Sequence, residues 1–177
     1  MRRPLVLIAL ATIGFFLFLT VLSPKAPSGD QGLLPEGPAP PIRIKTPSGD
    51  HIALADLKGK VVLVKFWATW CGQCAMSTPH VQALYEKRKN KGLEVIGVAL
   101  ENDDGQQIPD YVREMGVTYP VGMADPPEDV GGWMKPSTGI PTVFLVDRKG
   151  KVRWSQSGFA PGREHEMDDA VDRLLNE

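Results

Sequence analysis

The feature that most constrains this chain is an apolar run that ends in two closely spaced cysteines. Residues 61–68 are almost all apolar and rich in β-branched side chains, which is typical of a central strand buried on both faces of a sheet. Cys71 and Cys74 follow, and residues 75–89 then place apolar side chains, Met76 among them, at helical spacing. A strand that leads through this pair into a helix predicts an α/β fold with both sulfur atoms near the helix N-terminus.

Further predicted elements continue the alternation of strands and helices. We expect a short hairpin over residues 42–54, strands at 93–100, 142–147 and 152–157, helices at 108–115 and 162–175, and little regular structure at 116–122 and 125–138. Strand–helix–strand crossovers require parallel pairing, whereas the last two strands are joined by a short turn and must be antiparallel. This order predicts one α/β domain over residues 42–177 with a mixed sheet.

The first 22 residues are expected to form a separate segment. Arg2 and Arg3 precede an uncharged run over residues 5–22, which as a helix would span about 27 Å of a hydrocarbon core of about 30 Å. A cleaved signal peptide has a shorter apolar region and ends in small residues, so an uncleaved signal-anchor is favoured over it. The arginine pair predicts a cytoplasmic N-terminus, and either alternative exports the remainder of the chain. Residues 23–41 contain six prolines and are expected to be a Pro/Gly-rich linker.

The charge balance argues against a nucleic-acid partner. The 177 residues contain 20 Lys and Arg against 21 Asp and Glu, a formal net charge of −1. A dedicated nucleic-acid-binding domain normally presents a basic face, and no such excess is present here. A single domain of this size can also bury a sufficient core without disulfides. The cysteine pair is therefore not needed to hold the fold together.

The two cysteines admit three chemical interpretations. Residues three apart on a helix share a face, so the sulfurs can meet, but a structural disulfide gains little stability from so short a loop. A zinc site needs about four ligands, whereas this chain has two cysteines and three scattered histidines, so neither a metal site nor a cofactor is expected. A helix N-terminus stabilises a thiolate through its dipole and free amides. The favoured interpretation is a redox dithiol.

At these residues the chain resembles a known family. Residues 66–74, Phe-Trp-Ala-Thr-Trp-Cys-Gly-Gln-Cys, look like the active-site segment of thioredoxin-like proteins. Pro79 matches the proline that kinks the active-site helix there, and residues 139–142, Gly-Ile-Pro-Thr, resemble the loop that carries the cis-proline of that family. The hairpin ahead of the first long strand is similar to the membrane-anchored TlpA/ResA-type branch. The resemblance covers about residues 38–177 and implies a thioredoxin-like three-layer α/β/α sandwich with a mixed central sheet and an N-terminal hairpin.

The resemblance also implies roles for the matching residues. Cys71 would be the exposed attacking thiolate, and Cys74 the more buried resolving thiol. Pro141 would form the cis peptide bond and keep a strand edge open for the backbone of a substrate; proline suits this position because it lowers the cost of the cis form. The residues expected to border and support the active surface are Trp70, Gly72, Gln73 and Ile140.

Several positions depart from the family pattern. Gln73 stands where thioredoxins carry proline, and the dipeptide between the cysteines tunes the thiolate and its reduction potential. Lys65 stands where thioredoxins have a buried acidic residue that assists proton transfer. A lysine there could lower the pKa values of the thiols or extend its ammonium group to solvent. Many relatives in the cytochrome branch carry Glu at the position of Ser77, and Glu101 is a candidate substitute for that acid.

We therefore expect an extracytoplasmic thiol–disulfide oxidoreductase, single-pass in the cytoplasmic membrane, that acts as a monomer in the periplasm or at the cell exterior. It would reduce disulfides in exported proteins with electrons from a membrane protein, and the resemblance implies apocytochrome c as a substrate. Two alternatives stay open. One is a disulfide oxidase or isomerase, although oxidants of this fold often carry a larger inserted domain. The other is a copper-binding thioredoxin-like chaperone, although such proteins usually place three residues between their cysteines.

Overall fold

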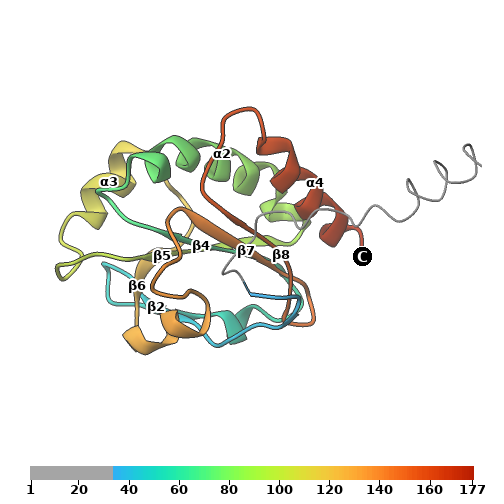
Figure 1. Ribbon diagram of the computed structural model, residues 1–177, viewed down its shortest axis with the longest axis horizontal. Coiled ribbons are helices and arrows are strands. Elements are labelled where there is room, and N and C mark those ends of the chain that lie inside the picture. Colours follow the sequence, from blue (N-terminus) through green and yellow to red (C-terminus); the bar gives the residue numbers. More distant parts are fainter. Residues whose placement is uncertain (1–33) are drawn as a thin grey trace, which may run out of the picture. The chain divides into compact units, whose positions relative to one another are not determined.

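In the computed structural model, residues 34–177 are described, and they build a single mixed sheet with helices packed on it (Figure 1). The strands are β1 (Gly37–Pro38), β2 (Arg43–Lys45), β3 (His51–Ala53), β4 (Val61–Trp67), β5 (Leu93–Ala99), β6 (Val121–Ala124), β7 (Thr142–Val146) and β8 (Lys151–Ser157). The α-helices are α2 (Gly72–Arg88), α3 (Ile108–Glu114) and α4 (Glu164–Leu175), and the 3-10 helices are η1 (Leu54–Leu57), η2 (Lys89–Lys91) and η3 (Pro127–Gly132). The strand order is β1-β8-β7-β4-β5-β6-β2-β3.

The central strand β4 is the apolar run that precedes the cysteines. All seven of its residues are buried. It pairs in parallel with β5 from Val61↔Leu93 to Trp67↔Ala99, and antiparallel with β7 on its other side. The β-branched and aromatic residues of β4 fill both faces of the sheet, which confirms the predicted central strand. Lys65 is the one charged side chain within it.

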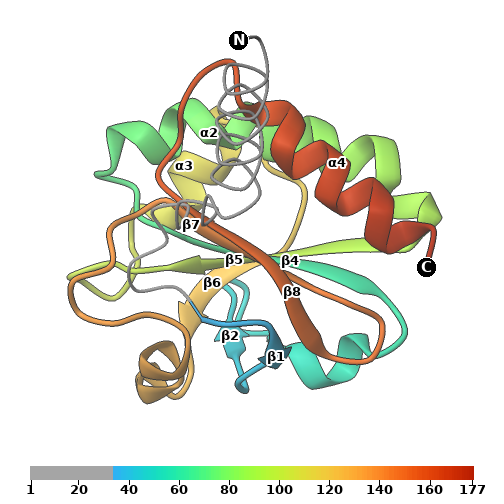
Figure 2. The ribbon, with the colours of Figure 1, turned by 45° about the vertical axis from the view of Figure 1, so that its right-hand side comes forward.

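The two faces of the sheet are covered by different kinds of structure. All three α-helices lie over one face (Figure 2). The helices α2 and α3 share this face because the crossovers from β4 to β5 and from β5 to β6 advance in the same direction and are right-handed. Their apolar residues share a core with the odd-numbered residues of β4. The opposite face is covered by residues of η1, by the segment through η3 and by the N-terminal part of the described chain, around the aromatic cluster of Phe66, Trp133 and Phe144. The predicted three layers and mixed sheet are confirmed, and the third layer consists of 3-10 turns and extended segments.

The predicted N-terminal hairpin is formed by β2 and β3. The two strands pair antiparallel with Ile44 opposite Ile52, and the turn between them is closed by a hydrogen bond from the Thr46 amide to the Asp50 carbonyl oxygen at 2.9 Å. Ile44 is fully buried and also pairs with Ala124 of β6. The hairpin thereby extends the sheet beyond β6, at the edge farthest from β8.

The strand β6 is not predicted by the sequence pattern. It has four residues, one of them Gly122, so neither alternation nor a long apolar run marks it. A Cβ atom at Gly122 would collide with the backbone of Lys45, so glycine is required where β2 passes so closely. The crossover through α3 leads from β5 to β6 and not to β7. The expectation that residues 142–147 run parallel to the preceding strands is therefore wrong. The strand β7 runs antiparallel to β4.

The predicted linker over residues 23–41 extends too far toward the C-terminus. Gly37 and Pro38 pair with β8 as an edge strand, and the Ala39 amide donates to the Gly150 carbonyl oxygen at 2.9 Å. Proline is tolerated there because an edge strand does not need every N–H in the ladder. The predicted anchor, residues 1–22, lies outside the described residues. Within residues 34–177, no helix combines the length and apolar character that crossing a bilayer requires.

Candidate active site

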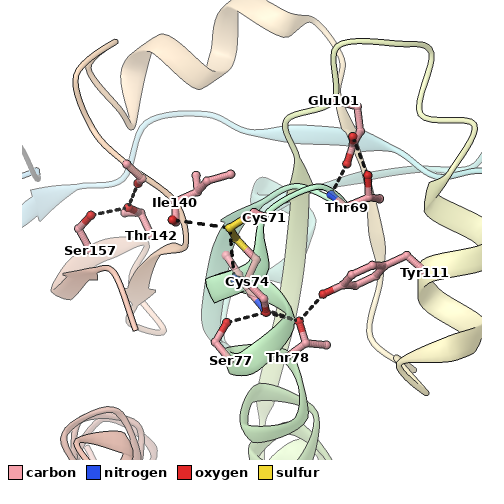
Figure 3. Close-up of a disulfide and its surroundings, with 12 residues drawn as sticks. Thr69, Cys71, Cys74, Ser77, Thr78, Glu101, Tyr111, Ile140, Thr142 and Ser157 are labelled. Atoms are coloured by element: carbon pink, nitrogen blue, oxygen red, sulfur yellow. Dashed lines mark hydrogen bonds between the residues drawn. A yellow bond between two sulfur atoms is a disulfide. The ribbon is translucent and has the colours of Figure 1, made fainter. Parts of the chain in front are cut away.

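The cysteine pair lies where β4 passes into α2, and its sulfurs are joined in a disulfide (Figure 3). Cys71 is the N-cap residue of α2, and its Sγ accepts a hydrogen bond from the Cys74 amide at 3.2 Å. That amide is one of the N–H groups that a helix leaves without an internal partner. A sulfur in this position is stabilised as a thiolate by the amide and by the positive end of the helix.

The two sulfur-bearing residues differ in exposure. Cys71 is 9% exposed, whereas Cys74 is completely buried beneath the first turn of α2. Their Cα atoms are 5.2 Å apart, so one turn of helix separates a residue at the surface from a residue in the core. Only Cys71 can meet a large molecule without a change in the fold.

The loop before β7 lies against the sulfur of Cys71. The Ile140–Pro141 peptide bond is cis, as the resemblance implies, and the Ile140 carbonyl oxygen lies 3.7 Å from Cys71 Sγ (Figure 3). The Thr142 hydroxyl donates to the Gly139 carbonyl oxygen at 2.6 Å, and the Gly158 amide donates to the Pro141 carbonyl oxygen at 2.7 Å. These bonds hold the loop against β8 and fix its position beside the disulfide.

Two large apolar side chains near the cysteines in the sequence, here called the apolar rim, are exposed. Trp70 is 61% exposed and Met76 is 54% exposed, and they are the two large apolar side chains that stand out to solvent in the described chain. Gly72 and Gln73, between the cysteines, are exposed as well. The prediction that Met76 lies on the buried side of the helix is wrong. The buried stripe of α2 includes Ser77 and Thr78, whose polarity conceals it in the sequence.

Lys65 lies beneath the buried sulfur residue. Its side chain points from β4 toward α2, and its Nζ donates to the Thr78 hydroxyl at 2.8 Å and to the Cys74 carbonyl oxygen at 3.5 Å. The residue is 1% exposed, so the interpretation in which its ammonium group reaches solvent is wrong. Burial lowers the pKa of Lys65 to about 7, because an ammonium group removed from water is destabilised.

Three hydroxyl groups complete this polar layer, and none of their roles is predicted by the sequence pattern. The hydroxyls of Ser77 and Thr78 donate to the Cys74 carbonyl oxygen at 2.9 and 2.8 Å, and the Tyr111 hydroxyl lies 2.9 Å from that of Thr78 (Figure 3). The Tyr111 ring stacks on Trp67 at 4.6 Å between centroids. Burial raises the pKa of Tyr111. Thr78 could have been found from its spacing, since it lies four residues after Cys74; Tyr111, on α3, has no such signal.

Glu101 is not in contact with the cysteines. Its carboxylate accepts hydrogen bonds from the amide and the hydroxyl of Thr69, at 2.7 and 3.0 Å. Thr69 lies two residues before Cys71, in the turn that leaves β4. Glu101 therefore anchors the turn that carries Trp70 and Cys71, and the geometry does not support it as the substitute acid.

The predicted site residues thus fall into three groups. One group gathers around the disulfide at the surface and comprises Trp70, Cys71, Gly72, Gln73, Ile140 and Pro141. Cys74 and Lys65 lie together below it. Glu101 reaches the site only through Thr69.

Comparisons with known proteins match this architecture. The family model described as Redoxin matches residues 35–171. The thiol–disulfide oxidoreductase ResA of Bacillus thuringiensis (strain Al Hakam) is 36% identical over 115 residues, covering 64% of each chain, and that of Bacillus subtilis (strain 168) is 26% identical over 151 residues, covering 85% of this chain and 80% of that one. The alignment therefore spans just under two thirds of the length of the first of these relatives.

A solved structure gives the same result. The thiol:disulfide interchange protein of the thioredoxin family from Chlorobium tepidum TLS superposes with a TM-score of 0.68 at 30% identity, covering 80% of this chain and 98% of that one. The likeness extends over the described domain, and the expected thioredoxin-like fold is confirmed.

Proposed function

We propose that this chain, which belongs to the redoxin family and is a thioredoxin-like protein of the TlpA/ResA type, reduces disulfides in exported proteins through Cys71 and Cys74. The observation that carries the proposal is the asymmetry of the pair. One sulfur caps a helix at the surface beside a cis-proline loop, and the other lies buried one turn further on. That arrangement fits a dithiol that attacks a partner with one sulfur and releases it with the other.

The first step is an attack by Cys71. In the dithiol form, the Cys74 amide and the helix N-terminus favour the Cys71 thiolate. Its sulfur forms a bond with one sulfur of the substrate disulfide. The substrate disulfide breaks, and its second sulfur leaves with the electron pair as a thiolate. The product is a mixed disulfide between Cys71 and the substrate.

The second step is resolution by Cys74. Its sulfur, after losing its proton, attacks Cys71 Sγ and forms the intrachain bond that the structure contains. The bond between Cys71 and the substrate breaks, and the remaining substrate sulfur leaves as a thiolate. Two electrons have then passed from the cysteine pair to the substrate. With no third cysteine in the sequence, the mixed disulfide has a single internal resolving group.

The apolar rim is the proposed contact surface for the substrate. Trp70 and Met76 offer exposed apolar area, and the carbonyl oxygen of Ile140 lies close to the Cys71 sulfur from the cis-proline loop. We assign to Pro141 the task of keeping this strand end open, because proline has no N–H with which to close it. Gln73, between the cysteines, is assigned to tuning the stability of the thiolate.

We extend the proposal to the place of action. Residues 1–22 would act as a signal-anchor in the cytoplasmic membrane, and a Pro/Gly-rich linker that ends before Gly37 would hold the domain outside the cytoplasm. The uncharged run behind Arg2 and Arg3 supports this. The domain would act as a monomer, receive electrons from a membrane protein, and have apocytochrome c among its substrates.

Insulin reduction tests the activity. The full-length protein in mild detergent, with dithiothreitol as reductant, is expected to accelerate the precipitation of reduced insulin. Cys71→Ser is expected to remove the acceleration, and Lys45→Met, an exposed substitution on β2, to preserve it. Absence of turnover by the unaltered protein would overturn the proposal.

Two further experiments test its finer parts. In whole cells first treated with a reductant, a membrane-impermeant maleimide should label Cys71. Labelling that appears only after the cells are lysed would contradict an extracytoplasmic domain. A peptide with an oxidised Cys-x-x-Cys-His haem-attachment motif should be reduced faster than a disulfide peptide of equal length without the histidine. Equal rates would contradict apocytochrome c as a preferred substrate.

A further inference from the structure

A pocket with a largely apolar lining lies at the opposite end of β4 from the disulfide. Its volume is about 320 Å³, and it is enclosed by η1, the segment after β1 and the turn that joins β7 to β8. Val62 and Val146, which pair in register on β4 and β7, contribute to its lining, together with Leu54 and Leu57 of η1. These residues belong to the core on the sheet face opposite the α-helices. The volume is within the range of small-molecule sites, roughly 300–1,000 Å³.

Three exposed lysines also line this pocket, here called the lysine pocket. They are Lys58 and Lys60, before β4, and Lys149, in the turn between β7 and β8. None of them takes part in an ion pair within residues 34–177. The one carboxylate in the lining, that of Asp147, already has partners, because Arg153 Nη1 lies 3.1 Å from it and two backbone amides donate to it. The pocket therefore combines apolar surface with positive charge that no carboxylate of the domain neutralises.

The two turns that carry the lysines are bound to each other. The Gly59 amide donates to the Arg148 carbonyl oxygen at 3.1 Å, and Arg148 Nη1 donates to the Gly59 carbonyl oxygen at 2.9 Å. Arg148 Nη2 also donates to the Leu175 carbonyl oxygen at 3.1 Å, so this guanidinium adds positive charge here without a carboxylate partner. Because the backbone already holds the turns together, a ligand does not have to gather the cations from separate places.

The lining indicates the chemistry of the ligand. Positive charge at the lysines calls for an anion, and lysine ammonium groups bind phosphate as point charges. The leucines and valines of the same pocket call for an apolar group attached to that anion. A phospholipid with a negatively charged headgroup has both parts in one molecule. Association of a protein with such a membrane strengthens with the apolar area it buries and with its attraction to anionic lipids.

The path of the chain favours a lipid over an acidic segment of a soluble partner. Ala39, Pro40 and Pro41 line the pocket, and the Ala39 amide donates to the Gly150 carbonyl oxygen at 2.9 Å. The chain therefore enters the domain beside the lysines. In the proposed arrangement, residues 23–36 alone separate the anchor from β1, and when fully extended they span at most about 50 Å. A bilayer would thus be within reach of this end of the domain.

We propose that the lysine pocket docks the domain on the membrane by binding an anionic phospholipid. The phosphate would lie among Lys58, Lys60 and Lys149, and an apolar part of the lipid would enter between η1 and β4. This inference rests on the proposed place of action, since it requires a bilayer beside the domain. Docking at this end of β4 leaves the end that leads to Cys71 directed away from the bilayer, toward exported substrates.

Acetylation of lysines in the full-length protein tests the inference. The protein is placed in nanodiscs of phosphatidylcholine, with or without phosphatidylglycerol, and treated with N-hydroxysulfosuccinimide acetate at low salt, and peptide mass spectrometry gives the rate at each lysine. Each lysine beside an anionic surface should strengthen binding by about fivefold, so phosphatidylglycerol should slow acetylation of Lys58, Lys60 and Lys149 by at least about fivefold. The exposed Lys45 and Lys87, on β2 and α2, should change by less than about twofold, and high salt should weaken the protection.

A variant and two soluble competitors identify the occupant. Ala55→Glu places a carboxylate at an exposed position of the lining and should remove the protection. Gln106→Glu adds the same charge on an exposed loop outside the pocket and should preserve it. Glycerol phosphate or polyglutamate, added to discs of phosphatidylcholine alone, should protect the three lysines much less than phosphatidylglycerol does.

Several results would overturn the inference. Equal acetylation of the lysine pocket in both kinds of disc would show that it binds no anionic lipid. Equal slowing at Lys45 and Lys87 would show a general effect of surface charge. Full protection by glycerol phosphate would identify a site for small anions, and full protection by polyglutamate a site for an acidic protein. If the protein does not enter discs of phosphatidylcholine, the proposed anchor fails, and acetylation in the presence of phosphatidylglycerol vesicles decides on the pocket by the same criteria.

Discussion

Cys71 and Cys74 are chemically identical side chains in opposite environments. Cys71 lies at the N-cap of α2, where its sulfur accepts a hydrogen bond from a backbone amide, and the exposed residues Trp70 and Met76 lie nearby in the sequence. Cys74 lies in the interior, where two hydroxyls and the amine of Lys65 bind its carbonyl oxygen while its side chain belongs to the apolar core. The sulfur of Cys71 accepts a hydrogen bond at the N-terminus of α2, whereas the side chain of Cys74 is completely enclosed by the core. One turn of helix thus suffices to give two thiols different tasks.

The largest effect should come from removing each sulfur in turn. Cys71→Ser should lower insulin turnover by on the order of a thousandfold or more, because the attacking nucleophile is lost. Cys74→Ser should also stop turnover, but should accumulate a covalent complex with the substrate that non-reducing electrophoresis and mass spectrometry detect. If Cys71→Ser accumulates this complex and Cys74→Ser does not, then Cys74 is the attacking residue and Cys71 the resolving one.

The next effect concerns the interior side alone. The pKa of Lys65 is about 7 in the folded protein against its ordinary 10.5, so between these values the unfolded chain binds more protons than the folded one. The free energy of unfolding should therefore rise as pH increases from about 7 to about 10.5, by on the order of a few kcal/mol on account of this group. Lys65→Met should lack this rise and be more stable at neutral pH.

Urea unfolding of the oxidised protein across this pH range measures the effect. Lys45→Met, which removes an exposed lysine, should keep the pH dependence of the unaltered protein. If the free energy of unfolding of Lys65→Met depends on pH as it does in the unaltered protein, the pKa of Lys65 is not lowered in the folded state.

Glu101 offers a test of the surface side. Glu101→Gln retains an acceptor but loses the charge that strengthens its hydrogen bonds from Thr69, so the free energy of unfolding should fall by about 1 kcal/mol. Insulin turnover should decline several-fold, since the turn that carries Trp70 and Cys71 is less firmly held. Asp104→Asn, an exposed carboxylate on the following loop, is the matched control. A loss of activity that appears only as a shifted pH profile would instead support the acid–base role.

The smallest effect on stability is expected for Trp70→Ala. The side chain is mostly exposed, so the free energy of unfolding should change by about 0.5 kcal/mol or less. The KM for insulin should rise several-fold while the first reaction with Ellman's reagent stays unchanged, because the small reagent does not need the rim. An equal loss with both reagents would mean that Trp70 acts on Cys71 rather than on the substrate.

Much of this arrangement could be predicted from the sequence because local patterns carry it. The apolar run of β4, the cysteine spacing and the proline of residues 139–142 are each readable within a few residues. The strand β6 could not be predicted, because four residues that include a glycine show no alternation of apolar and polar side chains. Without β6 in the predicted order, the direction of β7 was predicted wrongly. The polar layer under Cys74 was hidden for another reason. Thr78 and Tyr111 are far apart in sequence and become neighbours only when α2 and α3 pack on the same face.

The most direct test of the asymmetry is the selectivity of alkylation in the reduced, full-length protein. Iodoacetamide below one equivalent at pH 7, followed by peptide mass spectrometry, reports which sulfur is both accessible and ionised. We expect modification almost entirely at Cys71. Comparable modification at both residues, or a preference for Cys74, would contradict it.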